Sequence, residues 1–354
     1  MKQFSINTNE AGQRFDKYLF KLLKEAPSSF VYKMLRKKNI VLNGKKDDGK
    51  SILKEGDIVK VFLADDTFDK FSGVKSNVAD TFINVNDGID FKSYIIYEDS
   101  DVMLINKPSG VLSQKAEDKD VSINEMAISY MLSSKMILRD ELNTFKPSIV
   151  NRLDRNTSGM IVFGKSLKGI QILSELFKER SVDKYYLTIV EGVVDKEQII
   201  IGKISKDESK NMVSVVDIKS YDSNSENDYV NNLETEKADD KKFDYIKTGI
   251  KPIAVSKDNK YSLLQIKLYT GKTHQIRAHL SSINHPIIGD GKYGNAKVNE
   301  YFRNKYKLRN QLLHSYMLKF YECDLLVKDK EYTAKIPDVF AKILKGEFDG
   351  NVEF

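Results

Sequence analysis

Residues 149–166 read IVNRLDRNTSGMIVFGKS, and this stretch places a charged loop between two apolar runs. Apolar runs of this length on either side of a polar loop are typical of buried strands. The loop carries Arg152, Asp154 and Arg155. A loop between strands can present a carboxylate into a cleft, and guanidinium groups close by favour its charged form. An aspartate in such a loop can equally satisfy the backbone donors of a turn, so this stretch alone leaves both roles open.

The chain around this stretch predicts the fold class. YIIYEDSDVMLINKPSG at 94–110 indicates two strands around an acidic turn, residues 170–179 an amphipathic helix, and LRNQLLHSYMLKF at 308–320 a buried strand. No regular alternation of strand, helix and strand is present, which argues against a doubly wound parallel sheet. We therefore expect residues 93–354 to form one large α+β domain on a mixed, mainly antiparallel sheet.

Residues 1–63 have a different pattern. Apolar residues recur at helical spacing over 13–23, and a second helix, capped by Ser28 or Ser29, follows. An Asn43-Gly44 pair favours a hairpin turn, and residues 57–62 suit a short strand. These elements predict a compact αα-β unit.

Charge is distributed unevenly along the chain, whose net charge is +6. Residues 1–63 hold 14 basic and 7 acidic side chains, whereas residues 207–244 hold 11 acidic and 5 basic ones. The basic part suggests a surface that attracts phosphates, with a merely lysine-rich solvated surface as the alternative. The segment at about 219–244 has few large apolar residues and predicts a flexible acidic insertion. Residues 64–92, polar and broken by glycines, predict a linker.

Composition excludes several classes of protein. The single cysteine, Cys323, excludes an internal disulfide framework and a cysteine-based metal cluster, and it indicates a reducing compartment. No apolar run approaches the roughly 20 residues of a membrane helix, and the N-terminus has no signal-peptide core. We expect a cytoplasmic protein that is not attached to a membrane.

Two further segments carry candidate functional side chains. KYYLTIVEG at 184–192 is an apolar strand whose Tyr186 can stack on a base, pass a proton or simply pack in the core. YSLLQIKLYTGKTHQIRAHLSSINHPIIGDGKYG at 261–294 predicts a strand, a turn and a helix that begins near Thr273 and displays His274, Gln275 and Arg277. A helix N-terminus beside a guanidinium can bind an anion. The histidines of this segment lack familiar ligand spacing, so we expect no metal site.

In combination these segments resemble the signatures of RluA-type RNA pseudouridine synthases (RluA, RluC and RluD), which act on ribosomal large-subunit RNA. NRLDRNTSG at 151–159 is similar to His-Arg-Leu-Asp-x-x-Thr-Ser-Gly, KYYLTIVEG to Lys-x-Tyr-x-x-x-Val-x-Gly, and TGKTHQIRAH with HPIIGDGKYG to the longest signature. NKPSG and LLHS match two shorter ones, in the family's order. RFDKYLFKLLKE and LKEGDIVKV, within residues 1–63, resemble an S4 RNA-binding domain. A helical unit with basic solvent faces is the alternative there.

The resemblance implies residue roles. Asp154 would be the essential carboxylate, Tyr186 would pack against the target base, and Arg277 would pair with Asp154. The implied substrate-binding residues are Arg152, Arg155, Thr157, His274 and Gln275, and those of the S4-like unit are Arg14, Lys17, Lys33, Arg36, Lys37 and Lys38. The expected reaction is isomerisation of a flipped uridine without metal or organic cofactor. We expect a monomer that acts on ribosomal rather than transfer RNA.

The chain departs from the family pattern at Asn151, where the signature has histidine. We expect altered hydrogen bonding in the loop and little effect on chemistry. Two other hypotheses are a non-catalytic S4-containing RNA-binding or ribosome assembly protein, and a glycosidase. A glycosidase normally needs two carboxylates facing one bond, and only Asp154 stands out as such a group. The presence of Asp154, Tyr186 and Arg277 together favours the synthase.

Overall fold

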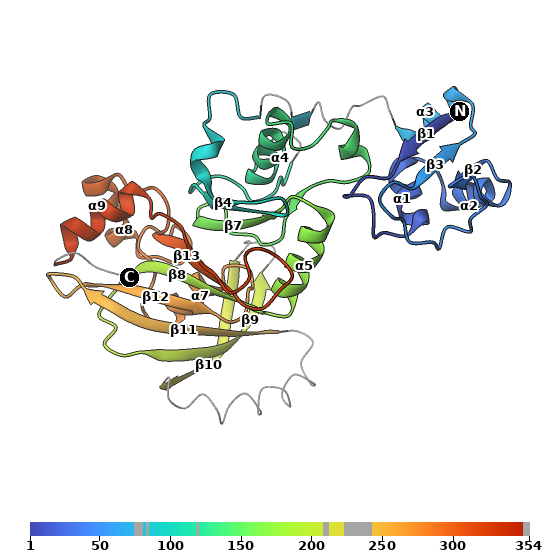
Figure 1. Ribbon diagram of the computed structural model, residues 1–354. Coiled ribbons are helices and arrows are strands. Elements are labelled where there is room, and N and C mark those ends of the chain that lie inside the picture. Colours follow the sequence, from blue (N-terminus) through green and yellow to red (C-terminus); the bar gives the residue numbers. More distant parts are fainter. Residues whose placement is uncertain (74–80, 83–84, 118–119, 208–211, 223–242, 350–354) are drawn as a thin grey trace.

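The computed structural model describes residues 1–73, 81–82, 85–117, 120–207, 212–222 and 243–349. They form a small N-terminal unit, blue in Figure 1, and a larger body built on one extended sheet. The elements of the N-terminal unit are β1 (Lys2–Ser5), α1 (Phe15–Leu22), α2 (Ser28–Arg36), β2 (Ile40–Leu42), β3 (Ile58–Val61) and α3 (Asp65–Ser72).

The N-terminal unit packs α1 and α2 with a three-stranded sheet of order β1-β3-β2. Both strand pairs are antiparallel. Apolar residues at helical spacing give α1 a buried face, which includes Phe15, Leu19 and Leu22. The αα-β arrangement expected for this part of the chain is therefore present, with β1 as an additional strand.

Local details of this unit differ from the expectation. Neither Ser28 nor Ser29 caps α2, because Pro27 is the N-cap residue and Ser28 is already helical. Proline suits that position because its ring fixes φ near the value found there, −57°. The turn at Asn43-Gly44 is present, with φ of 50° and 74°. Across this turn Leu42 and Lys45 exchange backbone hydrogen bonds of 3.0 and 2.9 Å, as a hairpin turn requires. The longer pairing of β2 is with β3.

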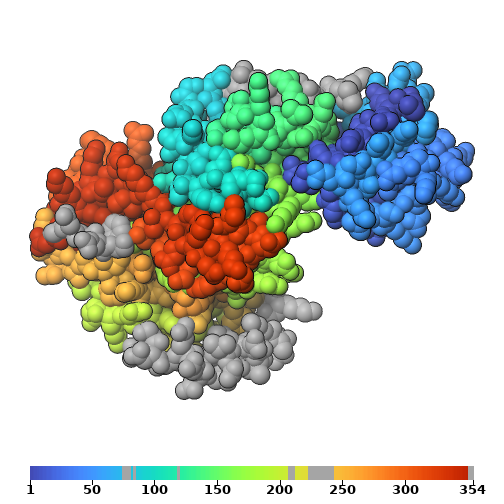
Figure 2. Space-filling view, viewed as in Figure 1, coloured from blue at the N-terminus to red at the C-terminus, as the bar shows by residue number. Residues whose placement is uncertain are grey.

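Both ends of the expected linker, 64–92, are structured. Phe68 of α3 is buried in the core of the N-terminal unit, and Phe91 is buried in the main core of the body. The two parts also touch elsewhere: Thr144 donates a hydrogen bond to the buried carboxylate of Glu10. Figure 2 shows the N-terminal unit against one side of the body.

An 11-stranded sheet runs through the body in the order β10-β9-β11-β12-β8-β13-β7-β5-β4, with β14 beside β13 and β6 beside β7. The strands are β4 (Ile95–Glu98), β5 (Val102–Lys107), β6 (Ser148–Ile149), β7 (Ser158–Gly164), β8 (Val182–Glu191), β9 (Gln198–Asp207), β10 (Met212–Asp222), β11 (Asp244–Val255), β12 (Tyr261–Leu268), β13 (Leu313–Phe320) and β14 (Glu331–Thr333). All neighbours are antiparallel except β13 and β7. The prediction of a mixed, mainly antiparallel α+β body is confirmed.

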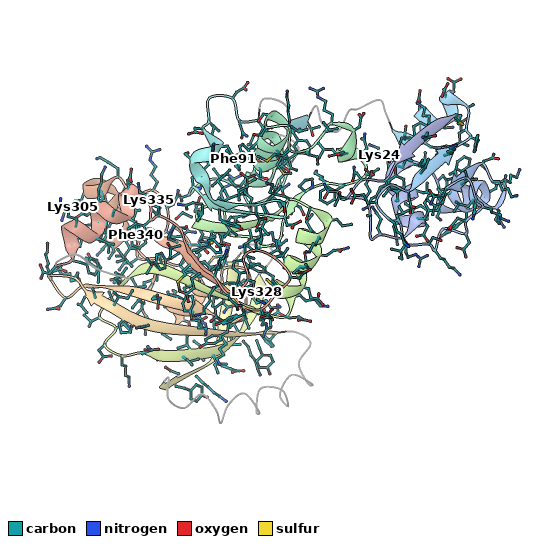
Figure 3. The ribbon with its side chains drawn as sticks, in the orientation of Figure 1. Lys24, Phe91, Lys305, Lys328, Lys335 and Phe340 are labelled. Carbon is teal, nitrogen blue, oxygen red and sulfur yellow. The ribbon has the colours of Figure 1, made fainter. Side chains whose placement is uncertain are left out.

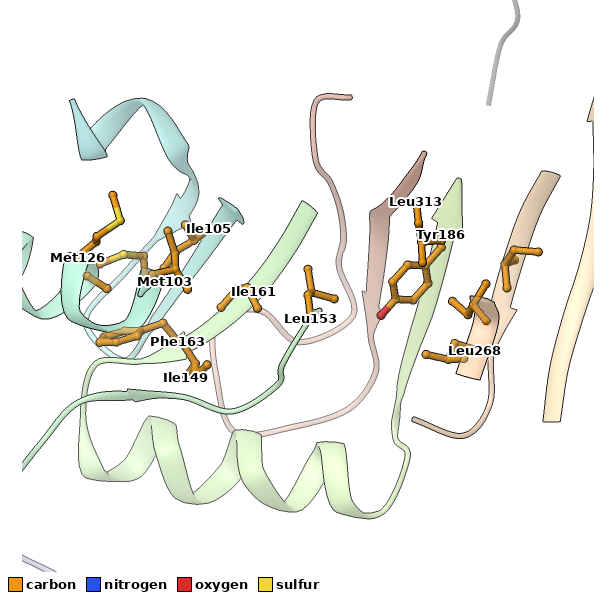
Figure 4. Packing of buried hydrophobic residues seen from close by; sticks show 14 of the residues in the cluster. Met103, Ile105, Met126, Ile149, Leu153, Ile161, Phe163, Tyr186, Leu268 and Leu313 are labelled. Atoms are coloured by element: carbon orange, nitrogen blue, oxygen red, sulfur yellow. The ribbon is translucent and has the colours of Figure 1, made fainter. Parts of the chain in front are cut away.

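Helices cover parts of both sheet faces. They are α4 (Ile123–Ser133), α5 (Leu167–Lys178), α7 (Gln275–Ser282), α8 (Ala296–Tyr306) and α9 (Asp338–Glu347), with 3-10 turns η2 (Phe91–Tyr94) and η3 (Asp140–Asn143). In the main core, Met103 and Phe163 from the sheet pack with Met126 of α4 (Figure 4). A second core holds Phe340 of α9, labelled in Figure 3, and Phe302 of α8. Among the described residues, no helix is long and apolar enough to cross a membrane.

Strand β13 joins the two halves of the sheet. It pairs in parallel with the start of β7, where His314 lies opposite Ser158 and Ser315 opposite Gly159, and antiparallel with β8 along most of its length. Gly159 has φ of +108°, and a Cβ there would lie 2.2 Å from the carbonyl oxygen of Ser315. This close backbone approach requires glycine.

The acidic segment begins later than expected. Residues 219–222 belong to β10, and residue 244 already begins β11. The rest of the predicted insertion, residues 223–242, lies outside the described part of the chain.

Candidate active site

Asp154 lies in the loop between β6 and β7, and backbone and side-chain hydrogen bonds fix that loop. Its carbonyl accepts a hydrogen bond from the Thr157 N–H at 3.1 Å. The Asn151 side chain reaches across to β7, accepting from the Val162 N–H at 2.7 Å and donating to the Met160 carbonyl at 3.2 Å. Asn151 therefore anchors the Asp154 loop to the strand that follows it.

Lys107, at the end of β5, is hydrogen-bonded to the same loop. It is fully buried and donates to the carbonyls of Pro108, Val111 and Arg155 at 3.0, 2.8 and 3.0 Å. Burial lowers the pKa of Lys107 to about 7, while the nearby charge of Asp154 opposes that shift. The sequence singled out the NKPSG run but gave Lys107 no role, because a lone lysine carries no signal that it will be buried.

Two hydroxyl groups complete the support. The Ser113 hydroxyl accepts from the Leu153 N–H at 2.9 Å and donates to the Leu153 carbonyl at 2.8 Å. The Ser109 hydroxyl donates to the Asn156 carbonyl at 2.6 Å. Residues on both sides of Asp154 are thus held by the loop that follows β5.

Arg277, on α7, links two carboxylates. Its Nη1 donates to Asp154 Oδ2 at 2.9 Å, while Nε and Nη2 donate to Asp290 Oδ2 and Oδ1 at 2.7 and 2.9 Å. The side chain of Asp290 is fully buried, whereas that of Asp154 keeps 26% of its surface exposed. The resemblance implied the pairing of Arg277 with Asp154 but gave no role to Asp290, although Asp290 lies in the GDGKYG run of the third signature.

The charges of this cluster stabilise one another. Burial opposes the Arg277 cation, but its hydrogen bonds and ion pairs with Asp290 and Asp154 raise its pKa above the ordinary value. Burial also opposes the Asp290 anion, but Arg277 and the backbone N–H groups of Lys292 and Tyr293 hold the pKa of Asp290 below its usual range. Two carboxylates share one guanidinium: the buried Asp290 accepts two of its N–H groups and the accessible Asp154 accepts one.

Tyr186 approaches Asp154 from β8. Its ring is only 6% exposed and lies beside Leu313 in Figure 4. Burial raises the pKa of Tyr186 to about 12, and the negative charge of Asp154 adds to that effect. The phenol therefore keeps its proton at neutral pH and offers a flat, largely apolar surface.

His274 is the N-cap residue of α7, so the helix begins two residues later than the predicted Thr273. Its backbone is left-handed, with φ of 54°. His274 Nε2 lies 3.9 Å from Asp154 Oδ2, and Nδ1 lies 3.1 Å from the Tyr293 hydroxyl. Burial lowers the pKa of His274.

Two residues expected to bind substrate are instead used by the fold. Gln275 is buried, and its amide bonds to the Thr270 hydroxyl, the Lys272 N–H, the Lys247 carbonyl and the Thr248 hydroxyl. Thr157 is also buried, and its hydroxyl accepts from Gln311. Both side chains satisfy buried polar groups, so this geometry favours a structural role for them.

The expected basic contact residues lie mostly at the surface. Arg152 and Arg155 are exposed beside Asp154, with Arg155 3.7 Å from Asp120. In the N-terminal unit, Arg14 forms a two-pronged hydrogen bond with the buried Asp16. The remaining expected RNA contacts are exposed: Lys17, Lys33, Arg36, Lys37 and Lys38.

Within the part of the chain that the structure describes, no three or more metal-binding side chains gather into a site. His279 bonds to the Thr248 hydroxyl through Nδ1, and His285 to the Glu191 carbonyl. The cluster around Asp154 instead combines one accessible carboxylate, its guanidinium partner, a protonated phenol and an imidazole. One carboxylate so placed can attack a sugar carbon or remove a proton from the sugar. Asp290 is buried and paired, so it does not supply the second open carboxylate that a glycosidase needs.

Comparisons with known proteins agree with this geometry. A family model described as RNA pseudouridylate synthase matches residues 101–282. An uncharacterized RNA pseudouridine synthase of Mycoplasma capricolum is 31% identical over 310 residues, 85% of this chain and 87% of its own. The ribosomal large subunit pseudouridine synthase C of Buchnera aphidicola is 29% identical over 346 residues, 96% of each chain. A solved human structure, RNA Pseudouridylate Synthase Domain Containing 4, shares the fold with a TM-score of 0.53 at 20% identity, covering 72% of this chain and 93% of its own.

Proposed function

The chain belongs to the RNA pseudouridylate synthase family, and from this premise we propose that it converts uridines of ribosomal RNA to pseudouridine with Asp154 as the essential carboxylate. The observation that carries the assignment to Asp154 is its position: it is accessible, yet Arg277 holds one of its oxygens at 2.9 Å. The Arg277 hydrogen bond is to Oδ2, so Oδ1 is the oxygen that we expect to meet a substrate.

The reaction detaches uracil from the ribose by breaking the bond between N1 and C1′. The base then turns, C5 bonds to C1′, the proton on C5 leaves, and N1, freed from the sugar, takes up a proton, so that product and substrate are isomers. Asp154 takes part either by attacking C1′ or by removing a proton from the sugar. In both routes Arg277 can hold the carboxylate in place, through its hydrogen bond of 2.9 Å to Oδ2.

The target base must leave its stack before it can react. Extruding a base costs a few kcal/mol, which aromatic stacking and inserted side chains partly offset. The flat ring of Tyr186 is suited to pack against the extruded uracil. The exposed guanidinium of Arg152 is suited to fill the space that the base leaves.

We assign RNA binding to both parts of the chain. Residues 1–63 would act as an S4-like domain, 64–92 as the connection, and 93–354 as the catalytic domain. Supporting this role, Lys33, Arg36 and Lys37 lie exposed on and just after α2, where they can meet phosphates. Arg155 is similarly exposed near Asp154, whereas Gln275 and Thr157 are not assigned to the substrate.

The substrate class follows from the relatives, among them the ribosomal large subunit pseudouridine synthase C of Rickettsia bellii, 28% identical over 335 residues. Ribosomal RNA would place the enzyme in the cytoplasm. We also propose that it acts as a monomer without a cofactor, with Asp154, Arg277 and Tyr186 as the groups that carry the reaction.

The test is pseudouridine mapping of total RNA from cells that lack this protein, complemented with the natural chain, with Asp154→Asn or with Asp324→Asn. Asp324 has 87% of its side chain exposed and serves as the matched control. We expect discrete ribosomal sites to lose pseudouridine and to regain it with the natural chain and the control only. Sites confined to transfer RNA would overturn the substrate class, and no change at any site would favour the non-catalytic RNA-binding hypothesis.

A further inference from the structure

Tyr293 contacts both side chains that approach Asp154 from α7. Its ring lies under the Arg277 guanidinium, 5.2 Å from the guanidinium carbon, and edge-on to the His274 ring at 5.7 Å. Its hydroxyl lies 3.1 Å from His274 Nδ1. Tyr293 is therefore placed to control the imidazole as well as to pack against it.

The neighbours of the Tyr293 hydroxyl point to one arrangement of the His274 proton. The backbone N–H of Val213, on β10, donates to the hydroxyl oxygen at 2.8 Å. A phenol that already accepts one hydrogen bond still has its own proton to donate, and His274 Nδ1 is the neighbouring acceptor. An imidazole that accepts at Nδ1 carries its proton on Nε2. That Nε2–H faces Asp154 Oδ2 at 3.9 Å.

Resting on the proposed function, we propose that Tyr293 locks His274 as a neutral imidazole with its proton on Nε2, which makes His274 a positioning residue for Asp154. In this role His274 supplies a second N–H donor to the carboxylate oxygen that Arg277 already binds. The distance of 3.9 Å is longer than a hydrogen bond, and such contacts commonly tighten when substrate binds.

The neutral form matters because Asp154 already has one cationic partner. A second cation on the same oxygen would draw electron density from the carboxylate and weaken it as a nucleophile or base. A neutral N–H orients the carboxylate without that added charge. The left-handed backbone of His274, rare for a residue with a side chain, also indicates that its position is imposed by its surroundings.

The charges that face His274 come from each neighbouring element. Burial is the largest influence and lowers the pKa of the imidazole. Asp154, from its loop, and Asp290, from the loop after α7, raise the pKa, whereas Arg277 and Lys292 lower it. The Tyr293 hydroxyl adds to the preference for the neutral ring, because it donates to Nδ1 and so satisfies the unprotonated nitrogen.

The first test is side-chain NMR of the full-length protein with isotope-labelled histidine. The chain has 4 histidines, and His274→Gln identifies the relevant signals. We expect the Nε2-protonated neutral ring at neutral pH. A signal showing the proton on Nδ1, or an imidazolium, would overturn the proposal. This measurement needs no RNA, so its result does not depend on whether the proposed function is correct.

The second test is the pH profile of single-turnover pseudouridine formation on a ribosomal RNA transcript. Tyr293→Phe keeps the ring but loses the hydroxyl, so we expect the acid limb of the profile to move upward by about one pH unit, with RNA affinity unchanged within about twofold. The shift should vanish in the Tyr293→Phe, His274→Gln double variant, because glutamine does not titrate. Tyr321→Phe, which removes an exposed hydroxyl bonded to Asp183, is the control.

Superimposable profiles for the natural chain and Tyr293→Phe would overturn the proposal. A shift that persists in the double variant would do the same, because it could not then come from His274. If the natural chain forms no pseudouridine on any ribosomal RNA while the NMR signals show the expected ring, the proposed function fails and the assignment of the His274 proton stands.

Discussion

Replacing Asp290 by asparagine is expected to disturb the site, because it removes a buried charge while keeping the size of the side chain. Asp290 Oδ1 accepts hydrogen bonds from Arg277 Nη2 and from the backbone N–H groups of Lys292 and Tyr293. The amide oxygen of asparagine would stay there. Its NH₂ group would then face Arg277 Nε, which donates to Asp290 at 2.7 Å, so that two donors would oppose each other.

The burial of Asp290 and Arg277 determines how much unfolding free energy the substitution removes. Removing one partner of a buried ion pair costs roughly 3–5 kcal/mol, because the other charge remains without compensation. Arg277 would keep Asp154 as a partner, so we expect the lower end, about 3 kcal/mol of unfolding free energy. The guanidinium would also lose its orientation toward Asp154, and a displacement of about 1 Å near the reacting groups can slow a reaction roughly 100-fold.

Chemical denaturation followed by circular dichroism measures the stability, and single-turnover pseudouridine formation measures the rate. The informative comparison is the double variant Asp290→Asn, Arg277→Met, which removes both charges. We expect it to recover most of the stability but none of the activity. An Asp290→Asn variant as stable as the natural chain, or a double variant as unstable as the single one, would refute the reasoning.

The remaining predictions concern Lys107, Gly159 and the basic surface. The folded-state pKa of Lys107 is lowered to about 7, so the unfolded chain binds one more proton between that value and about 10. The unfolding free energy of the natural chain should therefore rise with pH about 1.4 kcal/mol per unit more steeply than that of Lys107→Met in this window, and parallel curves would contradict this. Gly159→Ala should lose at least about 2 kcal/mol of unfolding free energy in denaturant titrations, because its Cβ would meet the Ser315 carbonyl, whereas Gly271→Ala, in open space, should be nearly neutral. Replacing Lys33, Arg36, Lys37 and Lys38 by glutamine should make RNA binding less sensitive to salt, with the log–log slope smaller by about 0.7–0.9 for each phosphate that these side chains neutralise. An unchanged slope would remove this surface from the RNA interface.

Elements with a strong local pattern could be predicted from the sequence. The strands β4 and β5 appear around their acidic turn as the apolar spacing indicated. Helix α5 begins three residues before the expected 170, and strand β13 covers only the part of 308–320 from Leu313 on. β1 was missed because KQFS is short and gains its stability from pairing with residues 58–61, far along the chain. Local patterns could not predict the parallel pairing of β13 with β7 either, because the paired residues, such as His314 and Ser158, lie far apart in the sequence.

Some residues of the candidate site could likewise be predicted from the sequence, and others could not. The resemblance brought Asp154, Tyr186 and Arg277 together. In the structure Arg277 binds Asp154, and Tyr186 lies near enough for the charge of Asp154 to act on its phenol. Asp290 and Tyr293 were missed because their importance arises from what they contact after folding. Polar side chains such as Gln275 invite a binding role in a sequence, but the sequence does not say whether backbone groups of the fold will use their hydrogen bonds first.

The place of β13 in the sheet has a consequence for biosynthesis. Asp154, Tyr186 and Arg277 all precede this strand in the chain, yet in the described part of the sheet β13 lies between β7, which follows Asp154, and β8, which holds Tyr186. Pairings between residues so distant in sequence form late in folding. A nascent chain thus carries every reacting group long before it can align them. The enzyme becomes competent only when nearly all of it has left the ribosome, and a chain truncated before residue 313 would leave these groups without the strand that aligns them.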